Sequence, residues 1–175
     1  MRLVFPNLSY KDKATDYIRE FYEYGSEING TGGLDRFLRE STYEAWLEKL
    51  VRDMDLANIP ESRVHGLTYF YVREADDRIV GMINIRLALN EFLRNEGGHI
   101  GYSVRPTERR RHYGTDMLNA GLKVCGVIGI REVLVSCDKE NAASAGVIKN
   151  CGGELQREFY SEAFHETVQM YAIRR

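Results

Sequence analysis

Long apolar runs and cysteines are both scarce in this 175-residue chain. No apolar run approaches the roughly 20 residues that a membrane span needs, and the first residues, MRLVFPNLSYKDK, reach charged positions too early for a secretory signal. The three cysteines, at positions 125, 137 and 151, are odd in number and fall in stretches that should pack, which is typical of thiols in a reducing compartment. We therefore expect a soluble, cytoplasmic protein with no membrane partner.

An excess of charge of one sign is also lacking. Lys and Arg number 24 against 26 for Asp and Glu, a formal net charge of −2, so the composition does not favour a nucleic-acid partner. The four histidines, at 65, 99, 112 and 165, are scattered, and no pair of cysteines has ligand spacing, so we expect no metal. The length suits one domain over residues 1–175.

Hydrophobic periodicity predicts the order strand, two helices, three strands, helix, strand, helix and two strands. We expect strands at 3–5, 67–74, 79–89, 97–104 and 132–137, and a closing hairpin over EFYSEAF and ETVQMYAI. We expect helices from Ser9 to Gly25, over WLEKLVRDM after a Ser41 and Glu44 capping box, from the arginines to Gly129, and from Asn141 to Gly152. GSEINGTGGLDRF is expected to be a mobile loop. The fold class is α+β.

Positive charge gathers at the mouth of one predicted helix, in RPTERRRHYGTDML (105–118). A helix N-terminus offers unpaired backbone N–H groups and the positive end of the helix dipole, which together bind phosphates. Arginines would strengthen such a site. The other interpretation is a solvated basic patch, since runs of charge usually lie on the surface.

The same stretch resembles the signature of the GNAT superfamily of acyl-CoA-dependent N-acyltransferases: Arg or Gln, two residues, Gly, one residue, then Gly or Ala. It falls on RRRHYG (109–114). GYSVRP before it, GTDML after it and VLVSCDKENAASAGVIKNCGG downstream also resemble that superfamily. YEAWL, VGMINIRLALNEFL and GGHIGY are similar to a bacterial subgroup of predicted acetyltransferases. The resemblance implies a mixed, mostly antiparallel sheet of about seven strands with helices on both faces.

The resemblance also implies acetyl-CoA as cosubstrate and a set of residues that hold it. The backbone of the fourth strand would pair with the pantetheine arm, while N–H groups of the signature loop would hold the pyrophosphate. Asn141 matches a position that often contacts the cofactor, and its other role, an N-cap, is compatible with this. The implied cofactor residues are Tyr102, Ser103, Val104, Arg109, Arg110, Arg111, His112, Tyr113, Gly114, Thr115 and Asn141.

Two positions depart from the family pattern. His112 stands where the signature has Gly, a residue chosen for close approach or positive φ, and histidine tolerates that conformation well enough for the loop to survive. Ile148 stands where many members carry a Tyr that protonates the departing CoA thiolate. Another group or solvent would then supply that proton.

His99 is the leading candidate for the catalytic base. It aligns with a position often filled by Glu in the family, and an imidazole titrates near neutral pH. Strand alternation places His99 on one face with two small residues, Gly101 and Ser103, which leaves room for a ligand. A structural histidine is the alternative. Lower-ranked candidates are an acylated Cys137, proton donors Tyr160 and Tyr171, and loop acids Glu27 and Asp35 that would attract a cationic amine.

These observations predict an N-acetyltransferase that moves an acetyl group from acetyl-CoA to a primary amine by direct transfer in a ternary complex. The acceptor would be a small-molecule or peptide amine. The alternative is a catalytically impaired module that binds acyl-CoA for regulation, suggested by Ile148 and His112. A third hypothesis, in which the arginines contact nucleic-acid phosphates, lacks a second basic stripe. Many members of the family pair through sheet edges, so we expect a homodimer.

Overall fold

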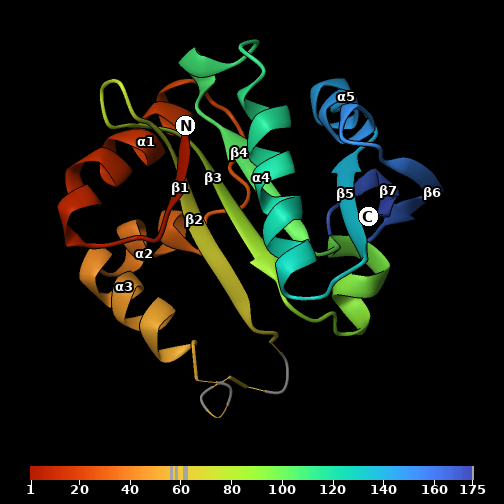
Figure 1. Ribbon diagram of the computed structural model, residues 1–175, viewed down its shortest axis with the longest axis horizontal. Coiled ribbons are helices and arrows are strands. Elements are labelled where there is room, and N and C mark those ends of the chain that lie inside the picture. Colours follow the sequence, from red (N-terminus) through yellow and green to blue (C-terminus); the bar gives the residue numbers. More distant parts are fainter. Residues whose placement is uncertain (56, 58, 61–62, 175) are drawn as a thin grey trace.

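The computed structural model describes residues 1–55, 57, 59–60 and 63–174. Within them the strands form two sheets, one in the order β1-β2-β3-β4 and the other β5-β7-β6 (Figure 1). The strands are β1 (Arg2–Val4), β2 (Gly66–Arg73), β3 (Arg78–Arg86), β4 (Ile100–Val104), β5 (Glu132–Asp138), β6 (Glu154–Ser161) and β7 (Glu166–Arg174). The helices are α1 (Lys11–Glu23), α2 (Leu34–Glu40), α3 (Tyr43–Arg52), α4 (Tyr113–Val127) and α5 (Ala142–Asn150), with short turns η1 (Leu8–Tyr10), η3 (Leu93–Gly97) and η4 (Pro106–Glu108).

The α+β class and the seven expected strands are confirmed among the described residues, with three corrections. The strands form two sheets instead of one, and each pair within a sheet is antiparallel. The Gly-rich stretch expected to be a loop contains the start of α2, because Gly33 ends the irregular part with a φ of 91°. The N-cap of α3 is Thr42, whose side chain accepts the Ala45 N–H, and not Ser41.

Helices cover both faces of the four-stranded sheet (Figure 1). Alternation along β3 divides the core: Met82 packs among the side chains of α1 to α3, whereas Ile83 packs against α4. Close packing of α4 depends on Gly121, where a Cβ atom would lie 2.5 Å from Ile83 Cδ1. The α4 and α5 core also takes in Val133 and Val135 of β5, so it joins the two sheets.

Candidate cofactor and acetyl-transfer site

The two sheets meet at β4 and β5, and each of these strands lies at the edge of its sheet. They are joined at one end, where the His99 N–H donates to the Leu134 carbonyl at 2.7 Å and Gly98 forms a bridge with Val135. Beyond this junction, the described residues of the two strands share no further backbone hydrogen bond. The facing edges therefore leave polar backbone groups available to a ligand.

The direction of the β4 backbone groups follows from its pairing with β3. The Arg86 N–H donates to the His99 carbonyl at 2.7 Å, and the Arg105 N–H donates to the Val80 carbonyl at 2.9 Å. Bonding alternates along an antiparallel pair, so the amide groups of Tyr102 and Val104 point away from β3, toward β5. Two of the three residues predicted to face the pantetheine arm thus present their backbone to the opening.

Ser103, the third predicted residue, is turned the other way. Its side chain is buried and donates to the Asn29 carbonyl at 2.5 Å, while the Tyr17 hydroxyl donates to the Ser103 carbonyl at 3.0 Å. Ser103 therefore ties β4 to α1 and to the Gly-rich loop. Sequence alternation alone indicated the face of this side chain but not its partners.

A buried ion-pair network anchors the signature loop to α1. Arg105 is 2% exposed, and its Nη1 lies 2.9 Å from Asp16 Oδ2 and 2.8 Å from Glu20 Oε2. The Thr107 N–H donates to Glu20 Oε1 at 2.9 Å. Burial tends to raise the pKa of Glu20, but the bonds from Thr107 and the charge of Arg105 outweigh it and hold that pKa below its ordinary value. Glu20 therefore stays ionised and fixes the start of the loop.

The loop then turns into α4 through two residues with left-handed backbone. Arg110 has a φ of 61° and His112 a φ of 63°, so histidine takes at position 112 the conformation for which glycine is usually chosen. His112 is the N-cap of α4, and its side chain makes no capping hydrogen bond. The first N–H groups of α4 consequently have no intrahelical or capping acceptor, as an anion site at a helix N-terminus requires.

The three arginines of the loop have different surroundings. Arg109 donates to the Val104 carbonyl at 3.2 Å and to Ser26 Oγ at 2.6 Å. Arg111 lies 3.3 Å from the buried Glu108 carboxylate. Arg110 is exposed, and no carboxylate of the described residues lies within ion-pair distance of it. Arg110 is the arginine whose charge is most available to a bound anion.

At the same end of the opening, α5 brings two hydroxyl groups together. Asn141 caps α5 by accepting the Ser144 N–H at 3.0 Å, so its N-cap role is confirmed. The Tyr102 hydroxyl lies 3.0 Å from Ser144 Oγ, and burial raises the pKa of that phenol. Burial also raises the pKa of Cys137 to about 11, which makes acylation of its thiol unfavourable. Ile148, one helical turn after Ser144, is fully buried in the core.

Residues 10–154 match the family described as the acetyltransferase (GNAT) domain. The chain belongs to the GNAT acetyltransferase family. No curated protein matches the sequence. Solved structures of similar fold include the ribosomal-protein-S5-alanine acetyltransferase of Vibrio fischeri, with a TM-score of 0.72, 14% identity, and coverage of 99% of this chain and 91% of that one.

Two other solved structures of similar fold are a self-immunity acetyltransferase and a spermidine acetyltransferase. A microcin C7 self-immunity acetyltransferase in complex with acetyl-CoA and AMP has a TM-score of 0.68 and 16% identity, covering 99% of this chain and 91% of that one. A spermidine N-acetyltransferase mutant from Vibrio cholerae has a TM-score of 0.63 and 12% identity, covering 99% and 95%. At these identities the likeness shows the GNAT fold, and the family match identifies an acetyltransferase.

In this GNAT acetyltransferase, His99 lies at the junction of β4 and β5. Its Nδ1 accepts the Leu134 N–H at 3.0 Å, and burial, followed by the charges of Arg86 and Arg94, lowers its pKa. A neutral imidazole has one lone pair for hydrogen bonding, and here Leu134 occupies it. To act as a base, His99 would have to release this bond. Its catalytic role stays a prediction.

The Gly-rich loop of the acetyltransferase crosses β4 on the face opposite α4. Gly30 has a φ of 71°, and a Cβ atom there would lie 2.3 Å from the Gly101 carbonyl oxygen. The Asp35 carboxylate accepts a hydrogen bond from the Thr31 hydroxyl at 2.6 Å, so it stabilises the Gly-rich loop. Burial, followed by the charges of Asp138 and Glu27, raises the pKa of Glu166. The attraction of a cationic amine by Glu27 stays a prediction.

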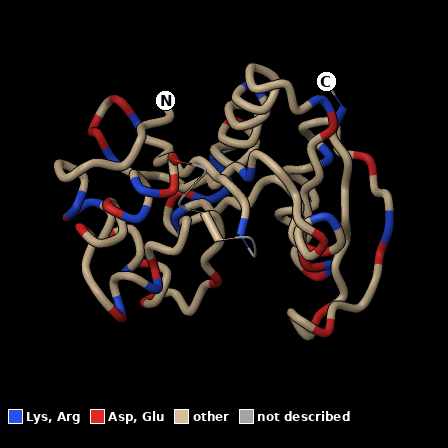
Figure 2. The backbone as a smooth tube through the Cα atoms, turned by 90° about the horizontal axis from the view of Figure 1, so that it is seen from below, with Lys and Arg blue, Asp and Glu red and all other residues tan. Residues whose placement is uncertain are grey.

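The remaining candidates lie apart from the opening or serve the fold. Tyr160 is 58% exposed on β6, whereas Tyr171 is fully buried and donates to Gln169 at 2.7 Å. No group of three His, Cys, Asp or Glu side chains suited to a metal occurs in the described part of the chain. Over the same residues, none of the helices combines the length and apolar character of a membrane span. Basic and acidic residues are interspersed along the chain (Figure 2).

Proposed function

We propose that this protein transfers an acetyl group from acetyl-CoA to a primary amine of a small-molecule or peptide acceptor, by direct transfer in a ternary complex. The proposal is carried by one arrangement: the open edge of β4 leads from the β4–β5 junction to the uncapped N-terminus of α4. A ligand with amides at one end and phosphates at the other matches this arrangement.

The chemistry requires a donor for the oxyanion and a donor for the departing sulfur. The N–H of Tyr102 points toward β5 and is the oxyanion donor we propose. For the sulfur we propose the hydroxyl pair of Tyr102 and Ser144, since Ile148 carries no donor and is buried. The raised pKa of Tyr102 keeps its phenol protonated, so it donates a hydrogen bond to the thiolate.

For His99 we propose a positioning role: its imidazole fixes the point at which β4 and β5 separate. The acceptor amine would then lose its proton to solvent before attack. General base catalysis by His99 is the alternative. Two features favoured a non-catalytic module: His112 in place of Gly and Ile148 in place of Tyr. His112 adopts the backbone conformation that the loop requires, and in this proposal the hydroxyl pair of Tyr102 and Ser144 takes the role of the missing Tyr.

Calorimetric titration with acetyl-CoA tests the cofactor site. Arg110→Glu should weaken binding about tenfold, because it reverses a charge beside the proposed pyrophosphate site. Arg131→Glu is the matched control, since Arg131 is also exposed but lies beyond the other end of α4, about 20 Å away along the helix. CoA release on addition of an amine tests transfer. Equal binding by both variants, or no binding by the native protein at millimolar acetyl-CoA, would contradict the proposal.

A further inference from the structure

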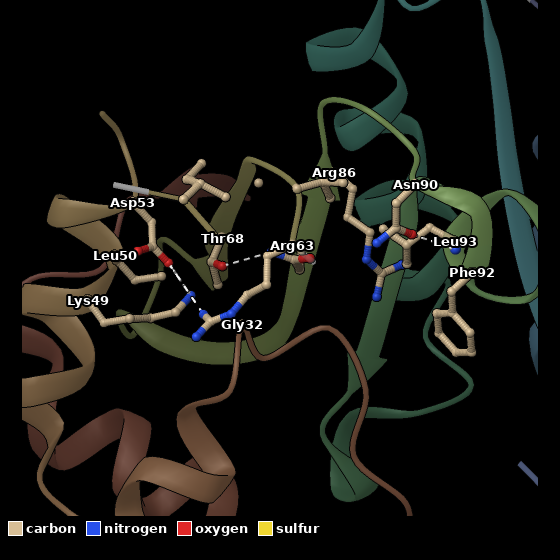
Figure 3. Close-up of a pocket in the computed structure, with 14 residues that line it drawn as sticks. Gly32, Lys49, Leu50, Asp53, Arg63, Thr68, Arg86, Asn90, Phe92 and Leu93 are labelled. Atoms are coloured by element: carbon tan, nitrogen blue, oxygen red, sulfur yellow. Dashed lines mark hydrogen bonds and ion pairs between the residues drawn. The ribbon is translucent and has the colours of Figure 1, made fainter. Parts of the chain in front are cut away.

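A cavity of about 300 Å³ lies on the α1 to α3 side of the four-stranded sheet, between the end of α3 and the segment after β3 (Figure 3). Its volume is at the lower end of the range of small-molecule sites. Polar side chains line it: Lys49 from α3, Asp53 from the C-cap of α3, Thr68 from β2, and Asn84 and Arg86 from β3.

Arg86 is the unusual member of this lining. Its Nη1 donates to the carbonyls of Gly97 and Gly98, both at 3.0 Å, and no carboxylate of the described residues lies within ion-pair distance. Arg105, the other guanidinium removed from solvent on this face, contacts both Asp16 and Glu20. Burial lowers the pKa of Arg86, which reflects the cost of holding its charge away from water without an anion.

The guanidinium of Arg86 therefore has donors to spare. Both N–H groups of Nη1 are accounted for by the two carbonyls, and a guanidinium carries five N–H donors in all. The groups on Nε and Nη2 remain for a planar acceptor. A carboxylate fits this fork through two parallel hydrogen bonds, and it would also supply the missing negative charge.

The rest of the charged lining favours an anion as well. Lys49 Nζ lies 2.9 Å and Arg63 Nη1 lies 3.8 Å from the same carboxylate, that of Asp53. With Arg86, which has no carboxylate partner among the described residues, the lining carries three cationic side chains and one acidic one. Such a site attracts a carboxylate and repels a polyamine.

The cavity borders the part of β4 where acetyl transfer is proposed. Asn84 stands opposite Gly101 in the β3–β4 register, and Arg86 Nη2 lies 3.6 Å from the position that a Gly101 Cβ atom would occupy. The next residue, Tyr102, presents its N–H toward β5. A carboxylate bound by Arg86 would therefore lie within one or two residues of the β4 edge at which acetyl transfer is proposed. The acceptor must then hold its amine and its carboxylate a few bonds apart.

We propose that the acceptor is an amine that also carries a carboxylate, of the size of an amino acid, and that Arg86 binds this carboxylate. The inference rests on the proposed function and names its substrate class. In the transfer step the neutral amine nitrogen forms a bond to the acetyl carbon, and the carbon–sulfur bond of the thioester breaks. The nitrogen then loses a proton to solvent and the CoA thiolate takes up a proton, so that CoA thiol and an N-acetylated acid are the products.

The test measures CoA release with the common amino acids, with the amide of each active one, and with spermidine. We expect a free amino acid to be acetylated, and its amide to have kcat/KM at least tenfold lower. Arg86→Gln should remove this preference by lowering kcat/KM for the acid and not for the amide, while Arg86→Lys should retain part of it. Arg131→Gln is the control for loss of an exposed arginine.

Acetyl-CoA titration of the same proteins separates this inference from the function on which it rests. Normal acetyl-CoA binding, with spermidine or the amides preferred, would overturn the inference and leave the cofactor site intact. So would normal binding with no amino acid acetylated, or an equal loss for all acceptors in Arg86→Gln. Absence of acetyl-CoA binding by the native protein would overturn the proposed function itself.

Discussion

Replacement of His99 distinguishes a residue that holds two strands together from a catalytic base. His99→Ala removes the acceptor for the Leu134 N–H, whereas His99→Asn keeps an acceptor near the position of Nδ1 but cannot titrate. We expect the Asn variant to keep most of its activity and stability and the Ala variant to lose both. The reason is that Nδ1 already holds a hydrogen bond and is not available for a substrate proton.

The size of the effect follows from the burial of His99, which is 9% exposed. An unsatisfied buried N–H costs about 1 to 3 kcal/mol, and a loss of about 2 kcal/mol lowers the Tm of a protein of this size by about 4 to 8 °C. The smaller side chain of Ala also leaves space at the junction. The Ala variant should therefore unfold earlier, and its KM for acetyl-CoA should rise because β4 is less well fixed.

Thermal unfolding and kcat/KM, each measured against pH, provide the assay. The pKa of His99 is lowered on folding, so the folded protein binds fewer protons at this site than the unfolded chain. The neutral imidazole's contribution to the free energy of unfolding is therefore fully present above about pH 6.5 and is lost as the pH falls through the folded pKa. The stability of His99→Asn should lack this pH dependence, because Asn does not titrate. A fall of a hundredfold or more in kcat for His99→Asn, with loss of the acid limb of the profile, would refute the reasoning and assign the base to His99.

Other predictions concern the loop, the missing Tyr and the hydroxyl pair. Gly30→Ala should raise the KM of the acceptor and also that of acetyl-CoA, because its Cβ would lie 2.3 Å from the Gly101 carbonyl oxygen of β4, the strand proposed to hold the cofactor; Gly25→Ala, with nothing within 4 Å, is the control. Ile148→Tyr should destabilise the buried core by about 1 to 3 kcal/mol in thermal unfolding and leave kcat no higher. Tyr102→Phe with Ser144→Ala should lower kcat about tenfold at unchanged acetyl-CoA affinity; an unchanged kcat would exclude the pair.

Much of the fold was predictable because its signals are local. Alternation marked the strands, helical spacing marked α1 and α4, and the signature marked the loop before α4. The tolerance of histidine for positive φ also predicted correctly that His112 would support this loop. Local patterns failed where a short helix lies within Gly-rich sequence, as with α2, whose start follows the positive φ of Gly33.

The sequence by itself therefore determined the order of the elements apart from α2, the family and the segment expected to bind phosphates. Only the tertiary structure decided the surroundings of the individual side chains. Glu20 and Arg105 are 85 residues apart in the chain, and the Leu134 N–H that occupies His99 comes from the other sheet. Arg86 has no sequence signal that separates it from a surface arginine. Hydrogen bonds and desolvation act through space over a few ångströms, so they depend on the packing of distant segments and not on spacing along the chain.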